Sequence, residues 1–256
     1  MSLDLPPLHE DLEFLSPLST DRANRLVGWL TAGLGDGGTV LEIGCGWGEL
    51  LLRVATAAPH VQVLGLDLDV GRVEEAQRRA LARGLSERAS FRPADASRTD
   101  ARPHDAVICI GASQAWVLGE AVGEPLDYAS ALRALRARVR RGGRLLFGEA
   151  IWSHSPTTEA TAALSGRTDE FISLPELVDL AEALGFAVAG IGEAAQDEWD
   201  AFEAGYCARY ATWLATHPAD HPDAGEVRDR AAGQRNGYLR GYRGVLGMAY
   251  LQLVAV

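Results

Sequence analysis

A glycine-rich turn between an apolar strand pattern and a helix pattern constrains the fold of this chain most strongly. Residues 40–55 read VLEIGCGWGELLLRVA, with Gly44, Gly46 and Gly48 at alternate positions. Glycine allows positive φ and a close approach of the backbone to a ligand, because no side chain occupies the space. The turn therefore predicts an α/β fold in which a bulky ligand lies on the backbone.

The residue after the third glycine indicates the kind of ligand. A nicotinamide fingerprint, G-x-G-x-x-G, would place glycine at position 49, where this chain has Glu49. A carboxylate at a helix N-terminus suits the helix dipole but repels a pyrophosphate. We therefore expect a ligand that lacks phosphate groups.

Strand and helix periodicities alternate along the chain. Strands are predicted at 39–44, 61–69, 90–96, 105–112, 144–150, 186–194 and 248–256, and helices at 19–34, 49–58, 70–84, 126–139 and 173–185. This alternation implies parallel, right-handed βαβ units, and so an α/β, Rossmann-like, doubly wound sheet with helices on both faces. Ligands bind such sheets outside the carboxyl ends of the strands.

Local signals mark some helix ends. Ser173 and Glu176 are spaced as a capping box at the start of a helix. Arginines are frequent over 133–144, but they follow a helical pattern, where cations complement the helix dipole. We interpret them as the end of that helix, with Gly142 and Gly143 as its stop, and not as a basic patch.

Length and patterning favour one domain over residues 1–256. A helical segment at 1–36 precedes the first strand, and a helical insertion at 195–244 interrupts the alternation before the last strand. Added helices at the ligand edge vary while the sheet stays fixed, so we expect this insertion to cap the substrate side.

Charge and composition exclude several classes of partner. The chain has 24 basic and 35 acidic residues, a net charge of −11 that disfavours nucleic acid. No apolar run approaches the roughly 18 residues of a membrane span, and the N-terminus lacks the features of a secretory signal. We expect a cytoplasmic monomer or homodimer with a small-molecule partner, bound to neither nucleic acid nor membrane.

The cysteines and histidines do not suggest a metal site. Cys45, Cys109 and Cys207 are far apart in sequence and form no CxxC pair. His217 and His221 flank a short PAD segment without Cys or acidic ligands converging on them. No metal is therefore predicted.

Two acids define the chemistry near the turn. Glu42 precedes Gly44 by two residues, and Asp67 ends the second predicted strand. A carboxylate at the end of that strand can accept hydrogen bonds from both ribose hydroxyls. With Glu42 beside it, the site is acidic and suits a ligand that carries an ammonium or sulfonium charge.

These segments resemble the class I S-adenosylmethionine-dependent methyltransferases. VLEIGCGWG is similar to that family's first motif, VLGLDLD to its second, PADA to its third and HDAVICIGA to its fourth. FAVAGIGEA and MAYLQLVAV resemble its sixth and seventh strands. The resemblance implies a seven-stranded, mostly parallel sheet with an antiparallel last strand, S-adenosyl-L-methionine as cofactor and S-adenosyl-L-homocysteine as product.

The resemblance also implies which residues hold the methionine end of the cofactor. Gly44, Cys45 and Gly46 would pass beneath it, in the turn that Gly48 completes. Glu42 would act near the methionine amine, directly or through water.

For the nucleoside end, the resemblance implies a second set of residues. Asp67 would hold the ribose, and Leu68 would lie against the adenine. Asp95 and Ala96 would meet the adenine amino group and ring edge. Gly111 would begin the loop beneath the methyl group.

The fourth motif also bears on the methyl acceptor. It reads CIGASQAW, without the N/D-P-P-Y/F sequence of methylases that act on amino groups of bases or glutamine. No HxxxD-like cluster of catechol methylation is found either. The C-terminal region resembles a bacterial subgroup of small-molecule methyltransferases, which favours a small-molecule acceptor.

General base catalysis is needed only if the acceptor must lose a proton. The candidates are Glu149 and His154, which follow the fifth strand, but the sequence favours a structural carboxylate and a solvent-exposed loop histidine over catalytic roles. Trp116 and Trp152 are candidates for walls of the acceptor pocket, with core packing as the alternative.

The segment before the last strand could bind an anionic acceptor. Tyr238, Tyr242 and Arg243 offer hydroxyl groups and a guanidinium with bidentate geometry. Two other functions stay open from the sequence, an NAD-dependent oxidoreductase and a noncatalytic module that binds an adenosyl nucleotide.

Overall fold

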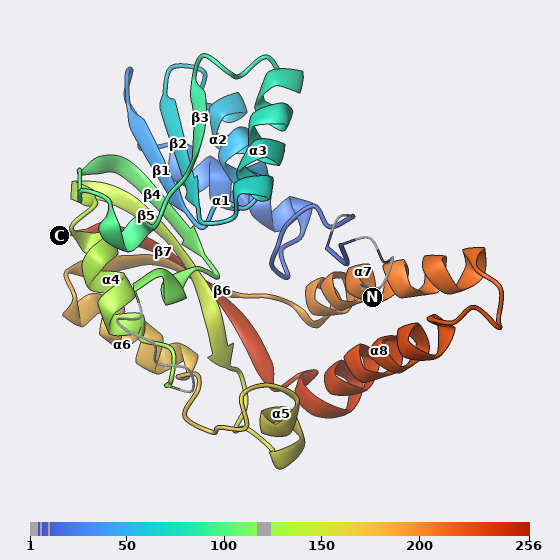
Figure 1. Ribbon diagram of the computed structural model, residues 1–256. Coiled ribbons are helices and arrows are strands. Elements are labelled where there is room, and N and C mark those ends of the chain that lie inside the picture. Colours follow the sequence, from blue (N-terminus) through green and yellow to red (C-terminus); the bar gives the residue numbers. More distant parts are fainter. Residues whose placement is uncertain (1–4, 6, 10, 117–123) are drawn as a thin grey trace.

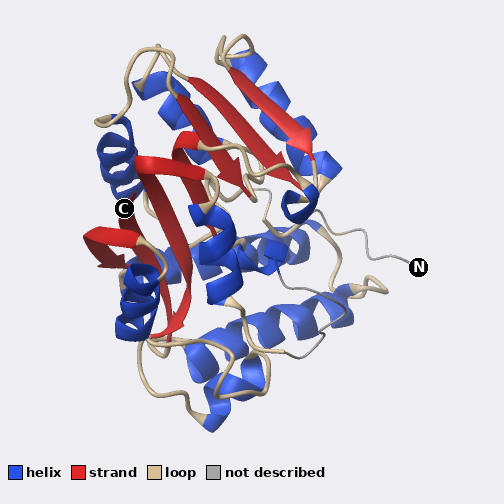
Figure 2. Ribbon diagram, turned by 90° about the vertical axis from the view of Figure 1, so that its left-hand side faces the viewer, coloured by secondary structure: helices blue, strands red, loops and turns tan. Residues whose placement is uncertain are grey.

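The computed structural model describes residues 5, 7–9, 11–116 and 124–256. A seven-stranded sheet lies between helices on both faces (Figures 1 and 2). The strands are β1 (Thr39–Ile43), β2 (Gln62–Asp67), β3 (Ala89–Pro93), β4 (His104–Ile110), β5 (Val139–Trp152), β6 (Phe186–Glu193) and β7 (Leu246–Ala255). The helices are α1 (Thr20–Thr31), α2 (Glu49–Ala57), α3 (Val70–Ala82), α4 (Tyr128–Arg136), α5 (Thr158–Ala163), α6 (Leu174–Ala183), α7 (Gln196–Thr216) and α8 (Ala224–Gly237), with short helical turns η1 (Ala96–Arg98), η2 (Ser113–Trp116) and η3 (Tyr238–Tyr242).

The strand order is β3-β2-β1-β4-β5-β7-β6. The pairs β1–β2, β1–β4, β2–β3 and β4–β5 are parallel, whereas β7 runs antiparallel to both β5 and β6. This topology confirms the predicted Rossmann-like sheet with a reversed last strand. The carboxyl ends of β1, β2, β4 and β5 therefore meet at one edge, which is where the candidate site residues begin.

Alternating side chains of the strands enter two separate cores, as the two-residue period of a strand requires. Ile108 of β4 packs beneath α1, α2 and α3 with Leu30 and Leu51. Its neighbour Val107 packs on the other face with Leu132 of α4. Helices on both faces explain why β4 is apolar at successive positions.

Several predicted helix boundaries are confirmed. Ser19 caps α1 by accepting a hydrogen bond from the backbone N–H of Arg22. Ser173 and Glu176 form both hydrogen bonds of the capping box of α6. Gly84, just after α3, has a φ of +67°, the left-handed conformation that ends a helix.

The prediction for the arginine-rich segment was right for Arg133 and Arg136, which lie in the last turn of α4, but wrong for the residues that follow. The helix ends at Arg136, and β5 begins at Val139, so Gly142 and Gly143 lie within β5 and do not stop a helix. The reason is that Val139 is 2% exposed and pairs with His104 of β4, which draws the segment into the sheet.

Residues 196–242, comprising α7, α8 and η3, form an arm that extends from the sheet (Figure 1). The two long helices pack against each other around Tyr210, Trp213 and Val227. Both ends of the arm lie side by side, because the N–H of Ala194 donates to the carbonyl of Met248 at 2.8 Å. Within the described part of the chain, no helix is both long and apolar enough to cross a membrane.

Candidate functional site

The glycine turn lies at the carboxyl end of β1 and has the geometry predicted for it. Gly44, Gly46 and Gly48 all have positive φ, at +69°, +52° and +74°. A Cβ at Gly44 would lie 2.4 Å from the Cβ of Ala112, and one at Gly48 would lie 2.4 Å from the ring of Phe91. Glycine is therefore required at these two positions by space as well as by conformation.

Asp67, at the end of β2, is bonded to the turn. Its Oδ2 accepts a hydrogen bond from the N–H of Gly46 at 2.8 Å, and its Oδ1 accepts one from the N–H of Asp69 at 2.9 Å. Each carboxylate oxygen retains accepting capacity for further donors. The carboxylate is thus fixed at the edge of the cleft and available to a ligand.

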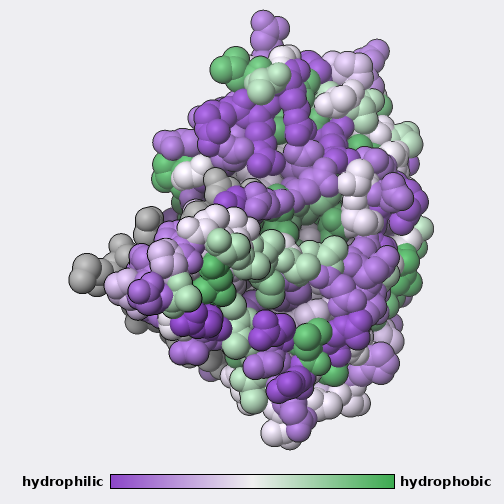
Figure 3. All heavy atoms as spheres, turned by 90° about the vertical axis from the view of Figure 1, so that its right-hand side faces the viewer, coloured by the Kyte–Doolittle hydropathy of each residue, from purple (hydrophilic) through white to green (hydrophobic). Residues whose placement is uncertain are grey.

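A cleft of about 430 Å³ opens at this edge of the sheet. It extends between the start of α3 and α7, on a largely hydrophilic face with apolar residues in and beside a hollow (Figure 3). Leu68 is 69% exposed there, although it is a large apolar side chain. The cleft is lined by Asp67, Leu68, Asp69, Arg72, Ala94, Ala96, Ile110, Gly111, Ala112, Gln114, Ala115 and Tyr206, with Leu15, Ile43, Gly44 and Leu66.

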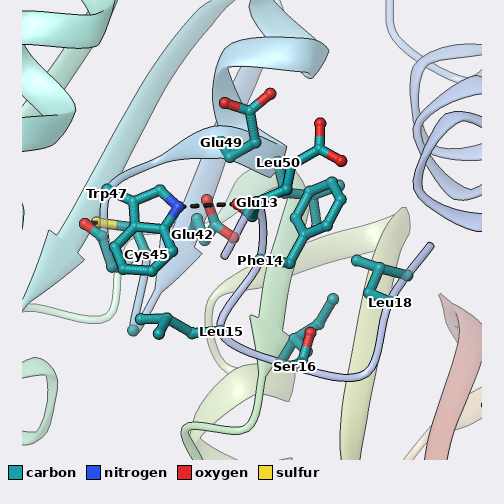
Figure 4. Close-up of a pocket in the computed structure, with 13 residues that line it drawn as sticks. Glu13, Phe14, Leu15, Ser16, Leu18, Glu42, Cys45, Trp47, Glu49 and Leu50 are labelled. Carbon is teal, nitrogen blue, oxygen red and sulfur yellow. Dashed lines mark hydrogen bonds between the residues drawn. The ribbon is translucent and has the colours of Figure 1, made fainter. Parts of the chain in front are cut away.

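A second, smaller cavity lies under the N-terminal segment and contains Glu42 (Figure 4). Glu42 is 6% exposed, and its Oε2 has no hydrogen-bond partner among the described residues. Burial raises the pKa of Glu42 well above its usual range, and the nearby Asp67 charge raises it further. A buried, unpartnered carboxyl facing a cavity is suited to a cationic group of a ligand.

The other predicted contacts at the turn are at or beside the cleft. Cys45 lines the Glu42 cavity, where burial raises the pKa of its thiol, so that it remains an uncharged part of the floor. Gly111 has a φ of +62° at the start of the loop after β4. Ala96 is buried and lines the cleft.

Asp95 has a local structural role beside the cleft. Its Oδ1 accepts hydrogen bonds from the N–H and Oγ of Ser97, which lower the pKa of Asp95. These bonds cap η1, so β3 ends at Pro93 and does not reach residue 96 as predicted. Asp95 does not line the cleft in this structure.

Glu49 does not present a free negative charge to a ligand. Its carboxylate is 7% exposed and lies within 3.0 Å of Arg53 and 2.5 Å of Arg83, with Arg79 at 3.6 Å. Glu49 therefore repels a pyrophosphate less than the sequence suggested. Glu42 and Asp67 are the acids that give the site its charge.

Glu149 reaches the site through the backbone. It is 5% exposed, and its two oxygens accept hydrogen bonds from the N–H of Ser113, at 3.1 Å, and of Ala150, at 3.0 Å. Burial raises the pKa of Glu149 despite these bonds. The carboxyl therefore holds the loop of Gly111 and Ala112, and it does not line the cleft.

His154, Trp152 and Trp116 do not line the cleft either. His154 is exposed, with Nδ1 2.8 Å from the carbonyl oxygen of Gly244. Trp152 is buried and donates to the carbonyl of Thr168. Trp116 is buried in the core.

Tyr238, Tyr242 and Arg243 are bonded to α7. The hydroxyl of Tyr238 and the guanidinium of Arg243 donate to Asp200 at 2.6 to 2.8 Å. Tyr242 donates to Glu203 at 2.7 Å. These residues hold the arm together, and they are not part of the cleft lining.

Several residues that line the cleft were not identified from the sequence, among them Leu15, Gln114 and Tyr206. Of these three, only Tyr206 lies in the predicted insertion. Across the described ranges, no group of three His, Cys, Asp or Glu side chains is arranged to hold a metal ion.

Together, the fold and the site define a Rossmann-like nucleoside-binding protein. A methyltransferase domain model matches residues 41–145. The chain is 34% identical over 196 residues to the uncharacterized protein YjhP of Escherichia coli, covering 75% of this chain and 74% of that one. It is also 34% identical over 143 residues to the 27-O-demethylrifamycin SV methyltransferase of Amycolatopsis mediterranei, covering 56% and 48%.

Among solved structures, a methyltransferase from Geobacter sulfurreducens in complex with S-adenosylhomocysteine matches with a TM-score of 0.81. The two are 27% identical and fully cover each other. The chain therefore belongs to the class I S-adenosylmethionine-dependent methyltransferases, and S-adenosylmethionine is its cofactor. Membership of this family excludes the two other functions that the sequence left open, an NAD-dependent oxidoreductase and a noncatalytic module that binds an adenosyl nucleotide. The residues fit that cofactor, since the glycine turn presents backbone without side chains and the buried Oε2 of Glu42 has no partner among the described residues.

Proposed function

We propose that this methyltransferase acts on a small-molecule acceptor. The observation that carries the proposal is the net charge of −11, which disfavours nucleic acid as the acceptor. The name of the rifamycin-modifying relative agrees with a small-molecule acceptor. The cleft of about 430 Å³, bounded by the glycine turn and by Tyr206 of the arm, would hold the nucleoside of the cofactor. We also propose that residues 1–256 form a single domain and that the protein is a monomer or a homodimer.

In this mechanism the chain's own residues bind the cofactor and orient the reacting groups. When bound, S-adenosylmethionine supplies an activated methyl group. Asp67 accepts hydrogen bonds from the ribose hydroxyls, and Glu42 binds the ammonium group. Glu149 acts as a positioning residue, because it fixes the loop of Gly111 and Ala112 under the reacting groups. Alignment of two reactants can lower a barrier by about 7 to 11 kcal/mol without a general base.

The acceptor class can be tested without knowing the acceptor. Purified protein is incubated with methyl-labelled cofactor and a cell extract that has been separated into small-molecule and macromolecular fractions. We expect the label in the small-molecule fraction. Label found only in nucleic acid or protein would contradict the proposal.

Asp67→Asn tests the assigned site by calorimetric titration with S-adenosylhomocysteine. Loss of a hydrogen bond to a charged group costs about 1.5 to 3 kcal/mol, so S-adenosylhomocysteine should bind about 10- to 100-fold more weakly. Asp69→Asn is the matched control, since Asp69 lines the same cleft but caps α3 through the N–H of Arg72. Equal affinities of the two variants would remove Asp67 from the site.

A further inference from the structure

The segment of residues 11–18, here called the strap, covers the edge of the sheet where the two cavities meet. The Glu42 cavity and the larger cleft share three lining residues, Leu15, Gly44 and Ile110. A ligand that occupies both cavities must therefore pass between these residues. Gly44 and Ile110 are fixed by β1 and β4, whereas Leu15 lies on a segment outside the helices and strands.

Leu15 lies directly over the glycine turn. A Cβ added to Gly46 would come within 3.0 Å of its Cδ1, and Figure 4 shows Leu15 beside Trp47 and Cys45 of the turn. Leu15 is only half-buried, so part of this apolar side chain is exposed in the structure. An apolar group at this position would exclude water from a charged centre beneath it.

The strap is attached to two different parts of the molecule near its outer end. The carbonyl of Glu13 accepts a hydrogen bond from Nε1 of Trp47 at 2.8 Å, and its carboxylate pairs with Arg53. Asp11 pairs with Arg209 of α7 at 2.5 Å. The acidic side chains in these pairs are 43% and 62% exposed, so each pair contributes little to stability.

The inner end of the strap is held more firmly. Glu198, at the start of α7, accepts hydrogen bonds from the N–H and Oγ of Ser19 at 2.9 and 2.5 Å. It also pairs with Arg22 at 2.6 Å, and its side chain is 6% exposed. The hydroxyl of Tyr250 donates to the carbonyl of Pro17 at 3.0 Å, a buried bond. The weakly held outer end and the firmly held inner end place the hinge at Ser16, just before the bonded Pro17.

We propose that the strap is a lid on the cofactor site, and that Leu15 is its cofactor-contacting residue at the junction of the two cavities. The lid opens from the Asp11 end about Ser16 to admit the cofactor, and it closes with Leu15 over the junction. Because Leu12 contacts α7 at Gly205, opening also releases the arm that carries Tyr206. The proposal rests on the proposed function for its choice of ligand.

The test is the binding kinetics of S-adenosylhomocysteine, followed by tryptophan fluorescence in stopped flow. In Leu15→Ala, dissociation should be about tenfold faster, since about two buried methyl or methylene groups are lost from the complex. Glu13→Gln weakens the closed lid without changing the junction, so association and dissociation should both become faster. Leu81→Ala is the matched control, because Leu81 is 72% exposed on α3, outside the site.

Hydrogen exchange gives an independent measurement. Backbone amides of residues 11–15 should exchange more slowly when S-adenosylhomocysteine is bound, while those of 16–22 should change little. If the wild type binds but Leu15→Ala has wild-type kinetics and strap exchange is unaffected, the lid is refuted and the cofactor site stands. If the wild type does not bind S-adenosylhomocysteine, both the lid and the proposed function fail.

Discussion

Glu42 gives the cofactor site a pH dependence that can be worked out from its surroundings. Without ligand, burial and Asp67 hold the pKa of Glu42 well above its ordinary value of 4.5. An ammonium group placed on the unpartnered Oε2 favours the charged form, so binding lowers the pKa and releases a proton. Affinity for S-adenosylhomocysteine should therefore rise with pH between the bound and the free pKa.

The magnitude follows from one proton. Within that window the association constant should increase up to tenfold per pH unit, equivalent to about 1.4 kcal/mol per unit. Above the window, Glu42→Gln should bind about 10- to 100-fold more weakly than the wild type, because it loses a hydrogen bond to a charged group. Towards low pH the affinities of the two proteins should converge.

Calorimetry from about pH 5 to about pH 8, in two buffers of different ionisation enthalpy, measures both the affinity and the proton released. Asp69→Asn should keep the wild-type slope. The same linkage applies to folding of the ligand-free protein: Glu42 holds its proton at higher pH in the folded state than in the unfolded state, so stability falls as pH rises from the unfolded pKa of 4.5 through the raised pKa of the folded state. A flat affinity profile with no proton release, or the same profile in Glu42→Gln, would refute this account.

Two further predictions concern stability. Gly44→Ala should destabilise the fold by about 2 to 5 kcal/mol, because the backbone there is left-handed and the new Cβ would clash with Ala112. Gly28→Ala, in the open middle of α1, should instead stabilise the fold by up to about 1 kcal/mol. Equal urea midpoints of the two variants would contradict this prediction. Burial would raise the pKa of Glu198, but hydrogen bonds from Arg22 and Ser19 lower it to about 2. The charged Glu198 therefore stabilises the fold by about 2 kcal/mol above its unfolded pKa of 4.5, and this stabilisation is lost as pH falls towards 2. Urea unfolding of Glu198→Gln should show a smaller loss of stability over that pH range. A loss as large as that of the wild type would contradict the role given to Glu198.

Local signals explain what could be predicted from the sequence. The glycine turn, Asp67 and the alternating strands depend on residues close together in the chain, and the structure has them as predicted. The predicted helix stop at Gly142 and Gly143 was wrong, because the charge pattern alone does not reveal that Val139 pairs with β4. Tertiary pairing there overrode the local preference for a helix.

Some residues that the sequence assigned to the site form hydrogen bonds or ion pairs with residues far away in sequence. Tyr238 and Arg243 appear free in a linear pattern, but Asp200, about 40 positions earlier, occupies their polar groups. Glu49 likewise faces Arg83 from another helix. Leu15 carries no polar signal at all, and only the folded chain brings it to the glycine turn.

The adjacent ends of the arm have an evolutionary consequence. Because Ala194 is hydrogen-bonded to Met248, the arm of residues 196–242 can be exchanged as a cassette while the sheet and the glycine turn stay as they are. New acceptors can then be recruited through changes in this cassette, provided that each replacement keeps a carboxylate at the position of Glu198 to meet Ser19.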